Sequence, residues 1–478
     1  MKSRAWLAAP IAFALGGCDF APRYAPPSVS LPSEFKDETA GGGALPASGM
    51  WWLSFDDRTL DDLQSQVDAA NPDLAAAVAA NDAAVARARA TLSGAYPQID
   101  AVPPFLANKQ SFNRPLRSAS QPIYYGDNAL AVQTAYEIDI WGRVRDLVHS
   151  ANATAEASAA ALADARLELH AELARAYVNL RGVDDEAKLL SDTITIYRAA
   201  LKLTQDRLNA QIASPVDVDR AQTQLSSAEA QASDLALNRA LLEDSIAALV
   251  GKAAASFSIS PSSTRLASPR PPRAVPADVL RRRPDVAQSE RLTAAASEVI
   301  GASRANFFPK FTLLALGGTQ DTKFRLFSAI NLFGTVGPTI DFPLFDAGLR
   351  QAELEVAKAQ FTQAAEQYRA TVLRAIKEVQ DELSSLRWLA EEYSQTTTAA
   401  EAARKAADLS LTLYRDGAAS YLDVVTAQSA ALEAERLAIA LHARQLAADI
   451  GLMLALGGGW SAPVEPRAKP GFAPYLAE

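Results

Sequence analysis

The sequence predicts a mainly α-helical fold with a few β-strands, built from two similar halves. The 478-residue chain is 49% hydrophobic but only 7% aromatic, and it is rich in alanine, which is typical of long, closely packed helices. Residues 142–213 and residues 347–415 each lack proline, so each stretch can form one very long helix. Residues 214–222 share five of nine positions with residues 420–428, which lie 206 residues later. This repeat indicates an internal duplication.

Residues 1–17 have the pattern of a secretory signal peptide. Two cationic residues precede an apolar run over residues 5–15, and such a segment is removed from the mature protein. Cys18 follows two glycines at the cleavage position, which resembles the lipobox of bacterial lipoproteins, where the thiol is lipidated. An ordinary signal peptide followed by a chance cysteine is the alternative. Asp19 comes next, and in enteric bacteria an aspartate at this position tends to hold a lipoprotein at the inner membrane.

The rest of the chain divides by composition and by the repeat. Residues 18–50 are rich in proline, glycine and serine and are expected to form an extended, lipid-anchored tether. We expect the first repeat over residues 51–255 and the second over residues 284–456. A proline-rich linker, residues 256–283, joins the repeats, and residues 457–478 form a C-terminal tail.

Each repeat is expected to contain a short helix, two strands, a long helix, a tight turn and a second short helix. The second long helix has a coiled-coil seam, whose apolar residues are spaced alternately by three and four: Ile376, Val379, Leu383, Leu386 and Ala390. Gly182 is expected to interrupt the first long helix weakly. Two shorter helices together reach the length of one long helix only if they stack end to end. The pairs are residues 72–95 with 216–250, and residues 284–305 with 421–456.

Four segments have the alternating pattern of β-strands: residues 98–112, 128–140, 307–320 and 331–344. In the second of them Leu130, Val132 and Tyr136 share one face. Segments of this length with one apolar face suit transmembrane strands, but a soluble sheet packed on helices fits the periodicity equally well. Four strands cannot close a barrel, since the smallest barrels have about eight. Membrane-spanning strands would therefore have to be shared among several copies of the chain.

The residue types argue against several classes of function. Cys18 is the only cysteine, which excludes an intramolecular disulfide and a cysteine zinc site. His149, His170 and His442 are far apart in sequence, and we expect no metal site and no cofactor. The net charge of −9, without runs of lysine or arginine, argues against nucleic acid as a partner. An enzyme is not expected, because the sequence shows no nucleophile–base pair and no phosphate-binding loop.

Four motifs resemble those of outer-membrane efflux lipoproteins, the TolC-like exit ducts of tripartite resistance-nodulation-division pumps. They are Ala21–Tyr24, Leu280–Val286, Gly301–Pro309 and Ala455–Trp460. The resemblance implies a homotrimer in the outer membrane, held there partly by lipid. Each chain would give four strands to a shared twelve-stranded β-barrel and its coiled-coil hairpins to an α-barrel tunnel in the periplasm.

The resemblance also implies partners and a task. A periplasmic adaptor protein and an inner-membrane pump would bind the duct, and small molecules such as drugs, toxic compounds or metals would pass through it. The proline-rich linker would belong to a belt outside the tunnel, although a plain linker between the halves is the alternative. Two other functions are considered: a lipid-anchored periplasmic coiled-coil scaffold without a pore, and the exit channel of a protein-secretion system.

In the family that the chain resembles, the tunnel closes where the turns of the helical hairpins meet, here residues 209–219 and 414–426. The resemblance implies that Asp217 and Asp423 correspond to the carboxylate residues of this tip, and that Tyr414 corresponds to the tyrosine of the gate. Three copies of a carboxylate around a narrow bore would attract cations. The alternative is that both aspartates cap the helices that follow them.

The tip also departs from the family pattern. Thr426 and Ala419 stand where the family often has an aspartate and an arginine, so we expect the gate to depend on other charged residues, namely Asp219, Arg220, Arg415 and Asp416. Gln211 stands where a glycine is usual, so it must either adopt a left-handed backbone or belong to a differently shaped turn. The expected docking surface for the adaptor consists of turn residues: Gln211, Gly417, Ala418 and Ala419.

Overall fold

The computed structural model describes residues 20–30, 35–36, 49–115, 118, 120–263, 266–269 and 283–460. The expected signal peptide, Cys18, much of the proline-rich linker and most of the C-terminal tail lie outside the described residues. The chain divides into two parts, which are described separately. The sheet part comprises residues 1–28, 80–159 and 288–369, and the hairpin part comprises residues 29–79, 160–287 and 370–478, each as far as described.

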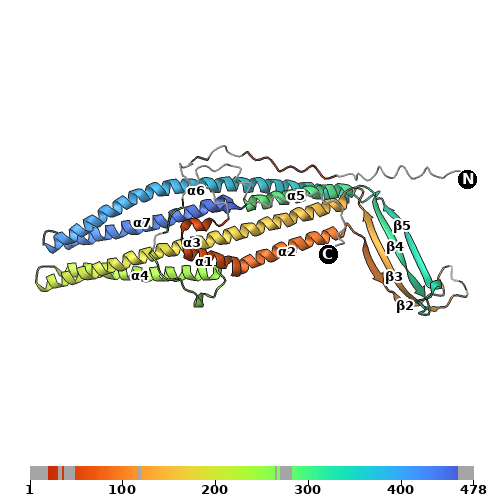
Figure 1. Ribbon diagram of the computed structural model, residues 1–478, viewed down its shortest axis with the longest axis horizontal. Helices are drawn as coiled ribbons and strands as arrows, with labels where there is room; N and C mark the ends of the chain where they lie inside the picture. The colour runs from red at the N-terminus through yellow and green to blue at the C-terminus, as the bar shows by residue number, and fades with distance from the viewer. Residues whose placement is uncertain are drawn as a thin grey trace. The chain divides into compact units, whose positions relative to one another are not determined.

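Most of the described chain is helical, and the helices follow the expected order (Figure 1). The long helices α3 (Arg143–Asn209) and α6 (Leu349–Arg415) have 67 residues each. The expected interruption at Gly182 is wrong, because α3 continues through it. The shorter helices are α1 (Arg58–Ala70), α2 (Pro72–Ser93), α4 (Pro215–Leu249), α5 (Pro284–Ala305) and α7 (Tyr421–Ala455). Single 3₁₀ turns are η2 (Trp51–Phe55), η3 (Ala254–Ser256), η5 (Ala329–Asn331) and η6 (Gly457–Gly459).

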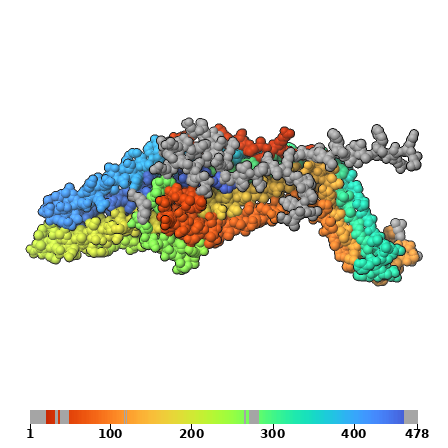
Figure 2. Space-filling view, in the orientation of Figure 1, coloured from red at the N-terminus to blue at the C-terminus, as the bar shows by residue number. Residues whose placement is uncertain are grey.

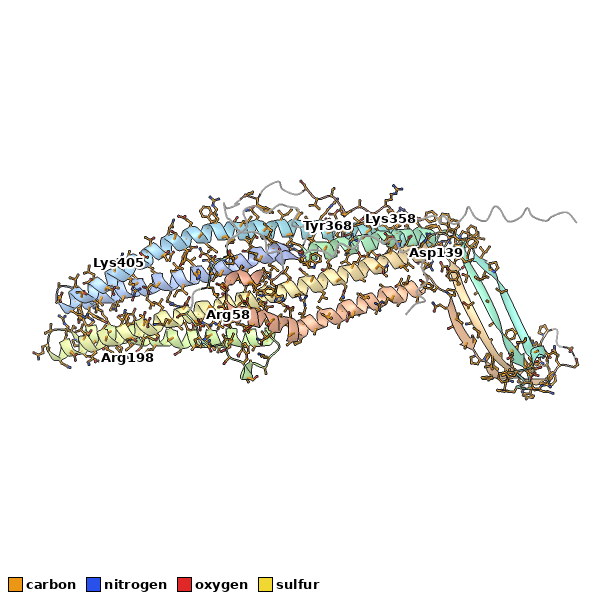
Figure 3. The ribbon with its side chains drawn as sticks, viewed as in Figure 1. Arg58, Asp139, Arg198, Lys358, Tyr368 and Lys405 are labelled. Atoms are coloured by element: carbon orange, nitrogen blue, oxygen red, sulfur yellow. The ribbon has the colours of Figure 1, made fainter. Side chains whose placement is uncertain are left out.

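Each long helix is capped by an aspartate that lies a few residues before its start. Asp139, labelled in Figure 3, accepts hydrogen bonds from the backbone N–H groups of Val144 and Arg145 at 3.1 and 2.9 Å. Asp346 likewise accepts from the N–H groups of Gly348 and Arg350 at 3.0 and 3.1 Å. The first N–H groups of a helix have no partner within the helix. The same solution in both repeats explains why both long helices start where they do.

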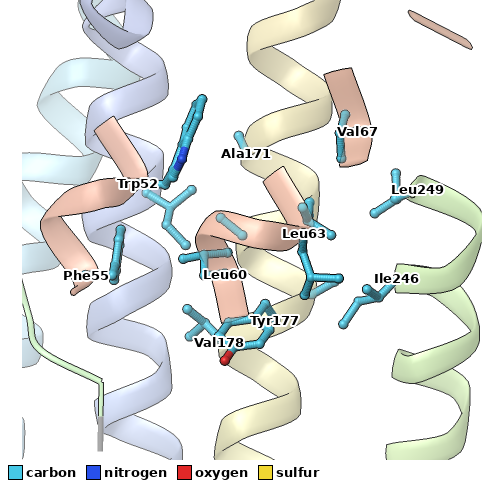
Figure 4. Close-up of a cluster of buried hydrophobic side chains, with 14 of the residues drawn as sticks. Trp52, Phe55, Leu60, Leu63, Val67, Ala171, Tyr177, Val178, Ile246 and Leu249 are labelled. Carbon is cyan, nitrogen blue, oxygen red and sulfur yellow. The ribbon is translucent and has the colours of Figure 1, made fainter. Parts of the chain in front are cut away.

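The main core of the hairpin part forms around α1, a helix that the sequence analysis did not anticipate (Figure 4). Its buried side chains include Trp52, Phe55, Leu60, Leu63 and Val67 from η2 and α1, Ala171, Tyr177 and Val178 from α3, and Ile246 and Leu249 from α4. Asp57 starts α1, and its carboxylate accepts both the Leu60 N–H at 3.0 Å and the Tyr177 hydroxyl at 2.9 Å. The cap and the core therefore fix α1 against α3.

Among the described residues, α7 is the one helix that is long and apolar enough to cross a membrane by length and composition. Half of its apolar stretch is buried, and Leu446, Ile450 and Met453 belong to the core around α1. These properties are those of a core helix.

The expected end-to-end pairing of short helices is seen at two joints in the hairpin part. Asn71, between α1 and α2, donates from its side chain to the carbonyl of Leu249 at the end of α4, at 2.7 Å. Arg283, just before α5, donates to the carbonyl of Ala455 at the end of α7, at 3.0 Å. The last carbonyls of a helix lack partners within it. Each joint therefore satisfies the end of one short helix with the residue that starts the next.

The sheet is antiparallel, and its strands run in the order β1, β3, β4, β5, with β2 also paired to β3 (Figure 1). The strands are β1 (Gln98–Val102), β2 (Phe105–Lys109), β3 (Tyr124–Ile138), β4 (Lys310–Asp321) and β5 (Leu332–Asp341). The single strand expected over residues 98–112 is wrong. Pro103 and Pro104 divide it, because proline has no N–H for the ladder. Four strand positions remain, with β1 and β2 at one edge and β5 at the other.

One face of this sheet is mostly apolar. The register aligns Val132 with Gly317 and Gly334, Thr134 with Ala315 and Val336, and Ile138 with Phe311 and Ile340. Val132 and Val336 are 53% and 75% exposed. The opposite face mixes in polar residues, such as the aligned Glu137, Thr312 and Thr339. The alternation expected from the sequence is confirmed, and the apolar face is exposed.

Candidate functional site

The hairpin part contains two helical hairpins, one formed by α3 and α4 and the other by α6 and α7. Each ends in a turn of the same form, and the two turns lie side by side (Figure 2). Gln211 and Gly417 occupy equivalent places, with φ of 58° and 78°. After each of them an N–H returns to the last turn of the long helix: Ile212 to Arg207 and Ala418 to Leu413, both at 2.8 Å. Gln211 therefore adopts the left-handed backbone, one of the two expected possibilities, although glycine would do so with less strain.

Asp423 caps α7. Its carboxylate accepts the Ser420 N–H at 3.0 Å and the Ser420 hydroxyl at 2.7 Å, while the Asp423 N–H donates to the Ser420 hydroxyl, a capping box. These hydrogen bonds from Ser420 lower the pKa of the Asp423 carboxyl. Asp217, its counterpart on α4, instead pairs with Arg220 at 3.5 Å. The capping alternative is thus confirmed for Asp423, and its role at a bore stays a prediction.

Asp423→Ala is expected to loosen the first turn of α7, because both bonds to the Ser420 N–H and hydroxyl are lost. We expect several-fold faster hydrogen exchange of the amides of residues 421–424, and a smaller effect for Asp423→Asn, which keeps an acceptor. Raised exchange with unchanged single-channel conductance would assign Asp423 to capping alone. Raised single-channel conductance would show that Asp423 also helps to keep the channel closed.

Tyr414 is buried between the two hairpins, where it packs edge-on against Tyr421 with ring centroids 5.2 Å apart. Arg207, at the end of α3, lies over the Tyr414 ring at 4.5 Å and donates to the Tyr414 backbone carbonyl. The Tyr414 hydroxyl has no hydrogen-bond partner among the residues that the structure describes. Besides hydrophobic packing in the cluster shared with α3 and α4, Tyr414 is held across the hairpins by Arg207, which contacts both its ring and its backbone carbonyl.

Sequence reasoning missed Arg207 and named other charges. Arg220 pairs within its own helix, with Asp217, and in the described chain no ion pair involves Asp219, Arg415 or Asp416, which are exposed. Arginine in the last turn of a helix is itself a common signal. Its partner, however, is 207 residues away, so the sequence did not connect them.

A groove of about 650 Å³ runs between α4 and α7, beside these turns. Its lining includes Val216, Arg220 and Gln224 from α4 and Val425, Leu432 and Arg436 from α7. Arg436 also links the hairpins, because it pairs with Glu186 of α3 and donates to Gln231 of α4 at 3.2 Å. The groove is therefore lined by an arginine, Arg436, that joins one hairpin to the other.

The start of the expected tether lies along α5 in the sheet part. Phe20 stacks on Phe308 with ring centroids 4.6 Å apart, and Arg304 donates to the Phe20 carbonyl at 2.9 Å. The Tyr24 hydroxyl donates to the Glu290 carbonyl at 3.1 Å. Residues 20–30 form neither helix nor strand, as expected for an extended segment. Cys18 is outside the described residues.

Comparisons with known proteins agree with this arrangement. The sequence profile described as outer membrane efflux protein matches residues 63–252 and 275–458, one match in each half. The chain is 29% identical to the toluene efflux pump outer membrane protein TtgC of Pseudomonas putida over 458 residues, 94% of either chain. It is 26% identical to the cation efflux system protein CusC of Escherichia coli over 462 residues, 94% of this chain and 97% of that one.

The structure is also similar to solved outer-membrane proteins. The channel OprN superposes with a TM-score of 0.86 at 26% identity, over 93% of this chain and 100% of that one. VceC of Vibrio cholerae superposes with a TM-score of 0.79 at 26% identity, over 87% of this chain and 99% of that one. Because the profile covers most of the sequence and both repeats, the chain belongs to the outer membrane efflux protein family.

Proposed function

We propose that three copies of this outer-membrane efflux protein form the exit duct of a tripartite pump, which conducts small molecules passively to the cell exterior. One observation carries the proposal: the sheet has an exposed apolar face and two open edges. In a membrane every backbone polar group needs a partner, so such edges must pair with further strands. Pairing β5 of one copy with β1 and β2 of the next closes the sheet.

The width of a duct favours three copies over two. The interior of a barrel of about eight strands is just filled by side chains, and the diameter grows with strand number. Two copies would give such a filled barrel, whereas three give twelve strand positions and a lumen. The mixed polar face of the sheet, which includes Glu137, Gln133 and Thr312, would line this lumen.

The groove between α4 and α7 supports an adaptor as partner. A helical hairpin inserted there would touch both hairpins of the chain at once, so its binding would be coupled to their separation. The turn residues named from the sequence, Gln211, Gly417, Ala418 and Ala419, lie beside the groove at the tip and would extend this surface. An inner-membrane pump would then join through the adaptor.

We further propose that Cys18 carries lipid in the outer membrane. Phe20 is held at Phe308, two residues before β4 begins, and two residues of chain span at most about 7 Å. A lipidated Cys18 would therefore lie close to the end of a membrane strand.

The function is tested by recording purified protein in planar lipid bilayers. We expect ion-conducting channels with small, closed-state conductance. Absence of channels from folded trimer would contradict the duct and favour the scaffold without a pore. Protein cargo is the other alternative, and relatives named for efflux of toluene and of cations favour small molecules.

Arg207→Ala is expected to raise single-channel conductance several-fold. The change removes the contact to the Tyr414 carbonyl and the stacking on its ring, which together join the two hairpin turns. Arginine on an aromatic face is worth about 0.5–2 kcal/mol, and the three copies of a trimer would multiply the effect on the bore.

Arg198→Ala is the matched control. Arg198, labelled in Figure 3, pairs with Glu229 at 2.9 Å within one hairpin, from α3 to α4. Its loss should leave conductance unchanged. If both variants conduct as the unmodified protein does, Arg207 does not hold the closed state.

A further inference from the structure

Three side chains that can bind metal converge between α3 and α5 in the sheet part. Asp146 and His149 are three residues apart, on one face of α3, and Glu298 belongs to α5. His149 Nδ1 lies 3.7 Å from Glu298 Oε2. One ligand atom from each of the three residues lies within 4.8 Å of the other two.

We propose that Asp146, His149 and Glu298 bind a divalent transition-metal ion such as Zn²⁺. One imidazole nitrogen and two carboxylate oxygens form a ligand set that suits this ion, with bonds of about 2.0–2.2 Å. Ligand atoms around a tetrahedral ion are about 3.3–3.5 Å apart, so the three groups must close slightly. The His149 side chain is 46% exposed and that of Glu298 is 21% exposed, which leaves both room to rotate and leaves a fourth position open to water.

The backbone of α5 makes room for the least mobile of the three ligands. Asp146 is buried in the first turn of α3, and the residue opposite it on α5 is Gly301. A Cβ at position 301 would lie 2.2 Å from Asp146 Oδ2 and 2.7 Å from the backbone N and Cα of Ala21, so a glycine here lets both the carboxylate and the backbone of residue 21 approach α5. With a neutral imidazole the three groups carry two negative charges, which one divalent ion neutralises.

The sequence analysis expected no metal site because the three histidines are far apart. That reasoning considered clusters of histidines, whereas this group needs only one histidine, a carboxylate three residues before it and a second carboxylate from another region of the chain. An ion here would cross-link the long helix of the first repeat to a short helix of the second. The proposal does not depend on the function of the duct.

The test is a titration of the full-length protein, purified in detergent with a tag that contains no histidine and stripped of metal with a chelator. Isothermal titration with Zn²⁺ is expected to give one ion per chain. His149→Ala and Glu298→Gln are each expected to weaken binding about tenfold or more, and added Zn²⁺ should raise the thermal unfolding midpoint of the unmodified protein but not that of either of these two variants. These two residues are preferred to Asp146, whose replacement risks disturbing the buried interface.

Glu156→Gln is the matched control. Glu156 pairs with Arg291 at 3.2 Å across the same two helices but is outside the proposed ligand set, so this variant should bind Zn²⁺ as the unmodified protein does. Absence of saturable binding would overturn the site. Equal affinity in His149→Ala and the unmodified protein, or equal loss in Glu156→Gln and the ligand variants, would overturn it as well, leaving His149 and Glu298 as an ion pair only.

Discussion

Arg283→Met is expected to lower the local free energy of unfolding of the joint between α5 and α7 by about 3–5 kcal/mol, the usual effect of removing one partner of a buried ion pair. The Arg283 side chain is only 8% exposed. It binds both oxygens of Asp285 at 2.9 and 2.8 Å, Glu378 at 2.7 Å and the Ala455 carbonyl at 3.0 Å. The variant leaves two carboxylates and a carbonyl without this donor.

The loss of stability caused by Arg283→Met should be larger at pH 8 than at pH 5. Burial, together with the charges of Asp285 and Glu168, raises the pKa of the Asp164 carboxyl to about 7, and the positive charge of Arg283 opposes this rise. Without Arg283 this pKa rises again. A folded-state pKa above the unfolded value means that the folded protein binds more protons, so its stability falls as the pH rises toward the folded pKa. Asp164→Asn in the Arg283→Met background should therefore restore part of the loss at pH 8.

Native-state hydrogen exchange of the amides at the start of α5 and the end of α7 measures this change directly. Arg369→Met is the matched control, because Arg369 is 45% exposed and pairs with Glu366 in the same helix. Arg369→Met is expected to change the local free energy of unfolding by no more than about 0.5 kcal/mol. Equal effects of the two substitutions would mean that the buried network at Arg283 does not stabilise the joint.

This joint shows what the sequence can and cannot predict. The lengths of the short helices predicted that they stack in pairs, and both pairings are found. The residues that fix the joints, Asn71 and Arg283, were not predicted, because the two repeats solve the same problem with different side chains. A comparison of one repeat with the other therefore cannot find them.

Helix α1 was missed for a different reason. Leu60, Leu63 and Val67 have helical spacing of three and four residues, and Asp57 before them is a good cap. The signal was therefore present. It was overlooked because the duplicated pattern, in which each repeat begins with a single short helix, left no place for an additional one.

At the tip and at the α3–α5 interface, the separation of residues along the chain limits which contacts the sequence can predict. The Ser420–Asp423 capping box joins two residues that are three positions apart, so the sequence could predict it as a cap. Arg207 and Tyr414 are 207 residues apart, and His149 and Glu298 are 149 apart. No local pattern relates such pairs, so they become visible only when the fold brings them together.

Gly318→Ala is expected to reduce the yield of assembled channel in the outer membrane by about tenfold or more, since each unpaired backbone group in a bilayer costs several kcal/mol. Gly318 lies opposite Ala131 in the β3–β4 ladder. A Cβ there would lie 2.1 Å from the Leu130 carbonyl oxygen and 2.6 Å from the Ala131 Cα. Both are backbone atoms, so the two strands would have to separate.

The neighbouring glycine provides the matched control, because a Cβ on Gly317 meets nothing closer than the Phe333 carbonyl oxygen at 3.8 Å, an ordinary contact. Gly317→Ala should therefore yield as much heat-resistant oligomer, and as many conducting channels in bilayers, as the unmodified protein. Equal yields from the two substitutions would contradict the β3–β4 register. The strands β3 and β4 come from different repeats. A low yield of assembled channel from Gly318→Ala, with a normal yield from Gly317→Ala, would therefore show that the barrel depends on pairing the two halves of the duplicated chain.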